Sequence, residues 1–169
     1  MEPRPAEALV VTSATIAPPA RTARSAARPA ALLLSVALSA LILTGCLPSN
    51  SQSFIDRTNS LRASHGIHAL RNHGALDAKA QAWAEETARR GSLVHSNLSD
   101  GLGYVAWRTI GENLASGSES GDWTAQLHNA LVASPGHYAN LVDRRFTHMG
   151  VGVAHARGMV YVVEVFVQI

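Results

Sequence analysis

The stretch SPGHYANLVDRRFTHMGVGVA, residues 134–154, contains signals for two kinds of secondary structure. Ser134 offers an N-cap oxygen and Pro135 suits the first turn of a helix, so a short helix carrying His137 is expected here. In MGVGVA, residues 149–154, apolar side chains alternate with glycines, which is the two-residue period of a strand. The stretch therefore predicts a short helix that leads into a strand. It leaves open whether His137 is an ordinary polar residue or one half of a site.

The C-terminal run MVYVVEVFV, residues 159–167, indicates the class of fold. HARG, residues 155–158, is expected to form a turn before it, and both alternating sets of side chains in the run are largely apolar. A strand that is apolar on both faces is covered on both sides. We therefore predict an α+β fold in which a sheet lies between two helical layers, a three-layer α-β-α sandwich.

The preceding part of the chain has the apolar spacing of helices. Apolar side chains recur at helical intervals from Phe54 to near Gly66, over 75–90, and again from about residue 121. Between the second and third of these helices, GYVAWRTIGENLASG, residues 103–117, is expected to form a strand followed by an irregular loop bounded by glycines. The order is thus helices first and paired strands last.

The N-terminal region has the layout of a secretory signal. Three arginines are followed by the uncharged apolar run PAALLLSVALSALIL, residues 29–43, which is shorter than the roughly 20 residues needed to cross a bilayer. LTGC, which ends at Cys46, resembles the lipobox of bacterial lipoproteins, and this resemblance implies that the Cys46 thiol receives a diacylglyceryl group. We therefore expect a signal peptide with an N-terminal extension (1–45), the lipidated cysteine with a polar linker (46–53) and one domain (54–169). The protein is then anchored by lipid in the cell membrane and faces away from the cytoplasm.

The cysteine count and the charge balance narrow the function further. Cys46 is the only cysteine in the chain, so it cannot form an internal disulfide. Four of the 14 Lys and Arg residues and two of the 12 Asp and Glu residues precede it, so the rest of the chain is formally neutral. A nucleic-acid-binding domain would show a basic patch or stripe. We therefore expect the membrane, but no nucleic acid, among the partners.

Five short motifs occur in an order similar to that of the CAP superfamily, which includes cysteine-rich secretory, antigen 5 and plant pathogenesis-related proteins. The motifs are NSLRASHGIHAL, LDAKAQAWAEETARRGSLVHS, IGENLA, SPGHYANLVDRRFTHMGVGVA and YVVEVF. Together they extend over nearly the whole region from Phe54 to Ile169. The resemblance, which is to a bacterial lipoprotein subfamily, implies an α-β-α sandwich and agrees with the layers expected from the apolar periods.

The resemblance also implies a central cleft lined by two histidines and two acids. Matched residue by residue, HS gives His95, GENLA gives Glu112 and GHY gives His137. The positions comparable to the second acid are Leu131 and Ser134, and many bacterial members resemble this chain in having serine there. The expected cleft therefore consists of His95, Glu112, Ser134 and His137.

Two imidazoles with a carboxylate nearby suit Zn²⁺ or another divalent metal of borderline softness. As members of the family are reported to bind metal in this way, His95 and His137 are the expected metal ligands. Glu112 could be a further ligand, could orient a histidine through a hydrogen bond, or could act as a general base. The sequence leaves these three roles open.

The remaining polar residues have simpler interpretations. Three of the other six histidines lie in one connecting segment and are expected to be solvated, and His128 is expected on the polar side of its helix. Asn59 and Arg62 are expected to stabilise the fold through hydrogen bonds. The chain has no GxSxG motif and Ser134 is explained by a capping role, so nucleophilic catalysis has no support.

Two classes of function remain. The first is a lipid-anchored binding module whose cleft holds a divalent metal, a small ligand, a lipid or a peptide. The second is a metal-assisted, peptidase-like hydrolase in which a histidine-bound metal activates water and Glu112 is the general base. Because the reduced number of acids leaves few groups for proton transfer, the binding module is favoured and no residue is assigned as catalytic.

Overall fold

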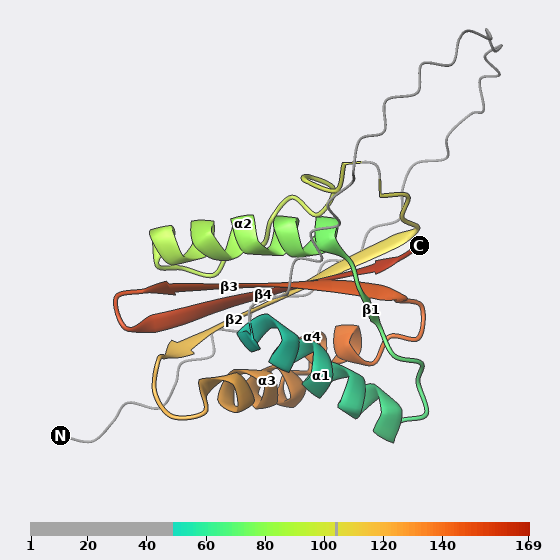
Figure 1. The fold of residues 1–169 in the computed structure, drawn as a ribbon, viewed down its shortest axis with the longest axis horizontal. Helices are drawn as coiled ribbons and strands as arrows, with labels where there is room; N and C mark the ends of the chain where they lie inside the picture. The colour runs from blue at the N-terminus through green and yellow to red at the C-terminus, as the bar shows by residue number, and fades with distance from the viewer. Residues whose placement is uncertain (1–48, 104) are drawn as a thin grey trace, which may run out of the picture.

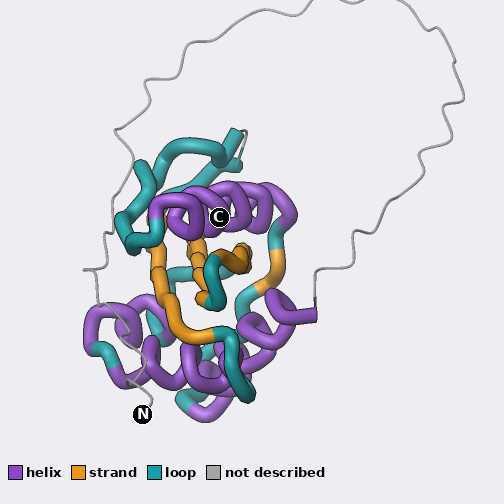
Figure 2. The backbone as a smooth tube through the Cα atoms, turned by 90° about the vertical axis from the view of Figure 1, so that its left-hand side faces the viewer, coloured by secondary structure: helices purple, strands orange, loops and turns teal. Residues whose placement is uncertain are grey.

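The computed structural model describes residues 49–103 and 105–169, which form a three-layer sandwich (Figure 1). The expected signal peptide (1–45) and the expected lipidation site, Cys46, lie outside the described residues. Along the described chain the elements are α1 (Ser49–Ser64), β1 (Arg71–Asn72), α2 (Gly74–Arg90), β2 (Thr109–Ser118), α3 (Trp123–Ala133), α4 (Pro135–Leu141), β3 (His148–Ala156) and β4 (Met159–Gln168). α2 covers one face of the sheet, and α1, α3 and α4 cover the other (Figure 2). The predicted α-β-α sandwich is confirmed. Within the described part of the chain, no helix is both long and apolar enough to span a bilayer.

The sheet has the strand order β1-β3-β4-β2, so β4 lies inside the sheet and β2 lies at one edge. β3 and β4 are antiparallel and are joined by Arg157 and Gly158, whose φ angles of 54° and 73° are the positive pair that a type I′ hairpin turn requires. β2 pairs with β4 over its whole length in antiparallel register. β4 has a partner along both edges, and its side chains contribute to the core on both faces because helices cover both sides of the sheet.

Gly150 and Gly152 allow α2 to lie directly on β3. A Cβ atom at Gly150 would overlap the backbone at Leu76, and one at Gly152 would overlap the backbone of Ala80. A strand glycine often marks such a close approach of another backbone. The two glycines of GVGV, residues 150–153, are therefore needed for the close packing of α2 on β3.

Two side chains of α2 complete the hydrogen bonding of β3. The Asp77 carboxylate accepts a bond of 3.1 Å from the N–H of Val151. One turn later, the Gln81 amide accepts from the N–H of Val153 (3.0 Å) and donates to its carbonyl (3.1 Å). These bonds satisfy strand groups that β1, with only two residues, does not reach, and they protect the sheet from edge-to-edge association.

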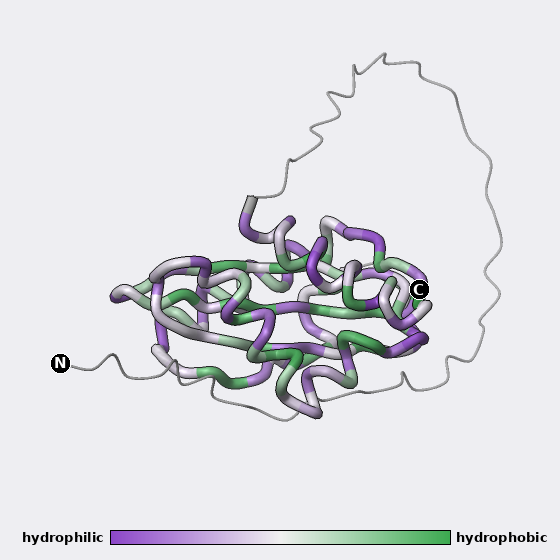
Figure 3. Tube along the Cα trace, turned by 90° about the horizontal axis from the view of Figure 1, so that it is seen from below, coloured by the Kyte–Doolittle hydropathy of each residue, from purple (hydrophilic) through white to green (hydrophobic). Residues whose placement is uncertain are grey.

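The hydrophobic core has one part on each side of the sheet. Hydrophobic segments (green) alternate with hydrophilic ones (purple) along the chain in Figure 3. Val163 and Val165 pack towards α2, whereas Val162 and Phe166 pack towards α1, α3 and α4, and all four are fully buried. The prediction that the C-terminal strand is covered on both faces is confirmed.

Arg62 and Asn59 anchor α1 to the rest of the domain, as expected. The guanidinium of Arg62 is fully buried and donates hydrogen bonds to the carbonyls of four residues, His68, Leu141, Asp143 and Phe146. Burial lowers the pKa of Arg62, and the nearby Asp143 carboxylate opposes this effect. Asn59 donates to the carbonyl of Leu70 and accepts from its N–H, at 3.0 and 2.8 Å.

Two expectations about element boundaries were wrong. The region 46–53 was expected to be a polar linker, but α1 begins at Ser49, so the described part of this region is helical. Its polar sequence forms a helix because it docks on the domain, where Ser51 is only 1% exposed. In the segment 103–117 the order is reversed: the described residues before Thr109 form neither a helix nor a strand, and the strand is formed by Thr109–Ser118, through its pairing with β4.

Candidate functional site

The candidate site lies at the edge strand β2, where two neighbouring residues carry polar side chains to opposite faces of the sheet. Glu112 lies opposite Val165, on the face covered by α2. Asn113 lies opposite Glu164 and bonds to it, on the face covered by α4. All three polar side chains have no exposed surface. The edge strand is therefore the element that both halves of the site share.

On the α2 side, the Glu112 carboxylate is held by three hydrogen bonds. Nδ1 of His95 donates to Oε1 at 2.8 Å, and the N–H of Ser96 donates to the same oxygen at 2.9 Å. The Ser96 hydroxyl donates to Oε2 at 2.6 Å and itself accepts from Nζ of Lys79 at 2.9 Å. Burial lowers the pKa of Lys79, while the Glu112 and Asp100 carboxylates oppose this effect. Glu112 is thus a buried carboxylate whose two oxygens are both used to fix the segment that follows α2.

On the α4 side, His137 is buried with 2% of its surface exposed. Its Nδ1 lies 2.8 Å from Oγ of Ser134, and its Nε2 is buried without a hydrogen-bonding partner among the described residues. Burial, followed by the nearby His95 imidazole, lowers the pKa of His137, so this ring is neutral at physiological pH. The expectation that the Ser134 oxygen caps α4 was wrong, because this side chain makes no capping bond and contacts His137 instead.

The structure therefore joins the predicted cleft residues in two pairs. His95 bonds to Glu112, and Ser134 bonds to His137. The two pairs are near each other, because the His95 imidazole contributes to the lowered pKa of His137. Leu131, which is one of the two positions that correspond to the second acid of the family, is buried in the core. Among the described residues, no cluster of three or more metal-ligating side chains is present.

Three buried residues of the site were not predicted from the sequence. Asn113 donates to Oε2 of Glu164 at 3.2 Å and to the carbonyl of His137 at 3.3 Å. Asn140 donates to Oδ1 of Asn113 at 2.9 Å and to the carbonyl of Glu112 at 3.4 Å. Burial raises the pKa of Glu164 to about 7, and the bond from Asn113 opposes this effect. The only sequence signal for Glu164 was an acid in the middle of an apolar strand.

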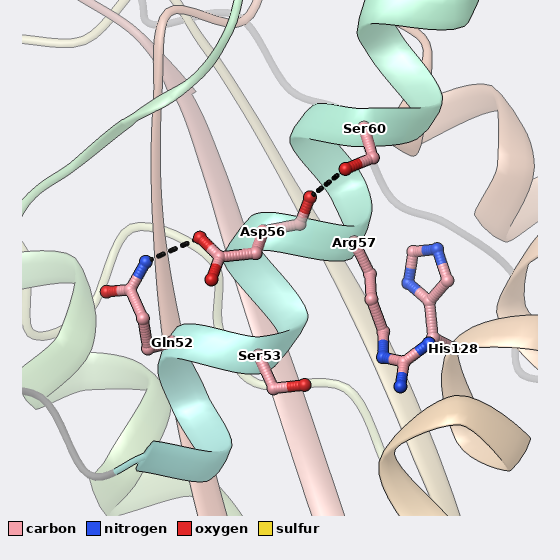
Figure 4. Close-up of a pocket in the computed structure, with 6 residues that line it drawn as sticks. All are labelled: Gln52, Ser53, Asp56, Arg57, Ser60 and His128. Carbon is pink, nitrogen blue, oxygen red and sulfur yellow. Dashed lines mark hydrogen bonds between the residues drawn. The ribbon is translucent and has the colours of Figure 1, made fainter.

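A separate pocket of about 660 Å³ lies beside α1, and the cleft residues do not line it (Figure 4). Figure 4 shows the Arg57 side chain of α1 beside the imidazole of His128 of α3. The expectation that His128 lies on the polar side of α3 was wrong, since it is 6% exposed and faces Phe54 at 6.5 Å between ring centres. Burial, with a smaller effect from Arg57, lowers the pKa of His128 to about 4. His128 is therefore a neutral core residue.

An α-β-α sandwich in which a half-buried histidine bonds to a buried glutamate of the edge strand, with a buried histidine near them, defines a protein of the CAP class. The chain belongs to the cysteine-rich secretory protein (CAP) family, because the sequence profile of that family matches residues 55–169. The resemblance noted from the five motifs is thereby confirmed.

Proteins of known sequence or structure agree with this assignment. The chain is 26% identical over 105 residues to the protein YkwD of Bacillus subtilis (strain 168), covering 58% of this chain and 40% of that protein. It is also similar to an extracellular SCP-domain protein of Bacillus anthracis (TM-score 0.61, 27% identity), covering 71% of this chain and 40% of that one. The chain thus spans about two fifths of the length of these two relatives. A further structure of the same fold, NaASP2, was crystallised with Zn²⁺ (TM-score 0.55, 18% identity, 70% of this chain and 80% of that chain).

Proposed function

We propose that this CAP domain is an extracytoplasmic binding module whose cleft holds a divalent metal ion such as Zn²⁺ between His95 and His137. The observation that carries the proposal is the bond from Nδ1 of His95 to the fully buried carboxylate of Glu112. A histidine that donates from Nδ1 to a carboxylate has the lone pair of its neutral ring on Nε2, which is the usual arrangement of a zinc-ligating histidine. Glu112 then orients the ligand rather than contacting the metal.

The second histidine fits the same interpretation. The contact of Nδ1 with Ser134 leaves Nε2 of His137 as the nitrogen that would contact a metal, and this atom has no other partner in the described part of the chain. The lowered pKa of His137 favours the neutral ring that metal binding requires. A bound Zn²⁺ would supply a Lewis acid with positions open to an oxygen or nitrogen of a small ligand or peptide.

The contacts of Glu112 favour binding over hydrolysis. A general base must reach the proton of the attacking water, directly or through one water molecule. Both oxygens of Glu112 are already occupied by His95 and Ser96, and the side chain has no exposed surface. The carboxylate is therefore placed to orient His95, and the metal-assisted hydrolase has no observation in its favour.

Calorimetric titration of the purified protein with Zn²⁺ tests this function. His95→Ala and His137→Ala should each abolish the same binding event, whereas His155→Ala, at a histidine whose side chain is 40% exposed, should leave it unchanged. Glu112→Gln should weaken binding by about 10- to 100-fold, as expected when a group that orients a ligand is altered. Unchanged zinc affinity in either cleft-histidine variant would remove that histidine from the site.

We also propose that Cys46 anchors the protein to the membrane through lipid, so that the domain is held at the cell surface. LTGC supports this proposal, and two acyl chains are sufficient for stable anchoring. Cys46→Ser should move the protein from the membrane fraction to the soluble fraction or leave an unprocessed precursor. If the variant fractionates and migrates like the wild type, Cys46 is not lipidated.

A further inference from the structure

The two histidines of the candidate site reach it from opposite faces of the sheet. His95 follows α2, which covers one face, whereas His137 lies on α4, which covers the other (Figure 1). Neither segment belongs to the sheet, so the distance between the two rings is fixed only if each segment is tied to a common element. β2, at the edge of the sheet, is the strand that both segments contact through hydrogen bonds.

We propose that Asn113, Asn140 and Glu164 are positioning residues that tie α4 to β2 and so fix His137 relative to the His95–Glu112 pair. The proposal rests on the proposed function, because these residues act on the metal site through His137. They touch the backbone of the site, not its ligating atoms.

The bonds of Asn113 define its orientation completely. Its amide nitrogen donates one hydrogen to the carbonyl of His137 and the other to Glu164, and its amide oxygen accepts from Asn140. If the amide were rotated by 180°, its oxygen would face two other acceptors, the carbonyl of His137 and Oε2 of Glu164. Only one orientation therefore satisfies the hydrogen bonding of the group. Because Asn113 is the residue after Glu112, one dipeptide of β2 holds the His95 segment with one side chain and the His137 segment with the next.

Asn140 closes the connection from the α4 side. It lies one turn after His137 on α4, and its amide donates to Asn113 and to the carbonyl of Glu112. Gly111 makes room for it, since a Cβ at this position would lie 3.1 Å from Oδ1 of Asn140 and 2.9 Å from the ring of Phe146. The glycine of the GEN sequence is therefore part of the same arrangement.

Glu164 holds Asn113 from the neighbouring strand. Its Oε2 accepts from Asn113, while its Oε1 is buried without a partner among the described residues. A glutamine at this position would keep an oxygen acceptor for Asn113, whereas a leucine would leave the amide hydrogen unpaired. A comparison of the two variants therefore separates the effect of the hydrogen bond to Asn113 from the effect of side-chain packing.

The test compares Asn113→Ala, Asn140→Ala and Glu164→Leu with the conservative variant Glu164→Gln. The control is Asn59→Ala, which removes two hydrogen bonds that connect α1 to Leu70. Two quantities are measured: the zinc affinity by calorimetry, and the pKa of the His137 imidazole in the metal-free protein by NMR titration. The second quantity needs no metal, so it remains informative if the proposed zinc binding fails.

If the three residues position His137, the disruptive variants should weaken zinc binding by about 10-fold or more. They should also raise the pKa of His137 towards its ordinary value of about 6.5, because α4 is released from β2 and the ring becomes hydrated. Glu164→Gln and Asn59→Ala should change neither quantity. A changed pKa in a protein that binds no zinc supports the positioning network and refutes the metal site.

Two results would overturn the inference. The first is a wild-type pKa of His137 in folded Asn113→Ala and Asn140→Ala. The second is an equal change in Asn59→Ala, which would show that the pKa follows general stability. If Asn113→Ala does not fold, Asn140→Ala and Glu164→Leu give the same comparison.

Discussion

Replacement of Glu164 by glutamine should remove a pH dependence of stability that one buried carboxyl group creates. Burial raises the pKa of Glu164 from 4.5 to about 7 in the folded protein, and the side chain has no exposed surface. In the unfolded chain the carboxyl ionises near 4.5, whereas in the folded chain it stays protonated until pH 7. The unfolded state therefore loses its proton first, and the free energy of unfolding falls as pH rises from about 4.5 to 7, then becomes level.

The size of the effect follows from the difference between the two pKa values. At 1.36 kcal/mol for each pKa unit, the contribution of Glu164 to the free energy of unfolding should decrease by about 3 kcal/mol across this range. Glutamine has nearly the same shape, keeps an oxygen for Asn113 and cannot ionise. Glu164→Gln should consequently gain about 3 kcal/mol relative to the wild type between pH 4.5 and 8.

Urea denaturation of both proteins at half-unit pH intervals measures this difference directly. Groups that titrate equally in the two proteins, such as the histidines and the other carboxyls, cancel in the subtraction. A constant offset between the two curves would reflect the exchange of a hydroxyl for an amide at a buried position. Two curves that stay parallel from pH 4.5 to 8 would refute the raised pKa of Glu164.

Three further substitutions test the packing of the sandwich, each by urea denaturation. Gly152→Ala should destabilise the protein by about 3 kcal/mol because its Cβ would overlap the backbone of Ala80, whereas Gly74→Ala, where no atom lies within 4 Å, should have little effect. Val163→Asp should cost several kcal/mol, because it introduces an unpaired charge in a strand covered on both faces, and a cost below about 1 kcal/mol would contradict that burial. Arg62→Met should cost about 3 to 5 kcal/mol because four carbonyls lose a buried donor, and a neutral result would mean that these bonds are not formed.

The sequence predicted the elements whose apolar period agrees with their tertiary contacts. α2 was predicted because its apolar residues recur at helical spacing, and in the structure Gly91 ends this helix with a φ of 69°. β4 was recognised because it is apolar on both faces. α1 was predicted from Phe54 onwards but missed at its start, where the residues are polar and only docking on the domain favours the helix.

The side-chain pairings of the site could not be predicted because they depend on contacts between distant segments. Ser134 has the sequence position of an N-cap, yet it contacts His137 because both are turned inward by the packing of α4 on the sheet. The sequence predicted that His128 lies on the polar side of α3, but in the structure it is buried and its ring contacts Phe54 of α1. Family order grouped His95 with Glu112, and the structure adds the hydrogen bond that relates them.

β2 is the element for which local preference and tertiary structure differ most. TIGENLASGS has few of the β-branched and aromatic residues that favour strands, whereas the preceding YVAWR has several, and the strand was accordingly expected too early. Pairing with β4 over ten positions overrides this preference. Glu112 and Asn113 remain tolerable inside such a strand because each is fully hydrogen-bonded, but apolar residues of similar size would fill the same space without the cost of burying polar groups. A strand that keeps buried polar residues on both faces, at a sheet edge and beside two histidines, agrees with the binding site proposed above, because departures from the pattern that folding alone favours are expected at functional sites.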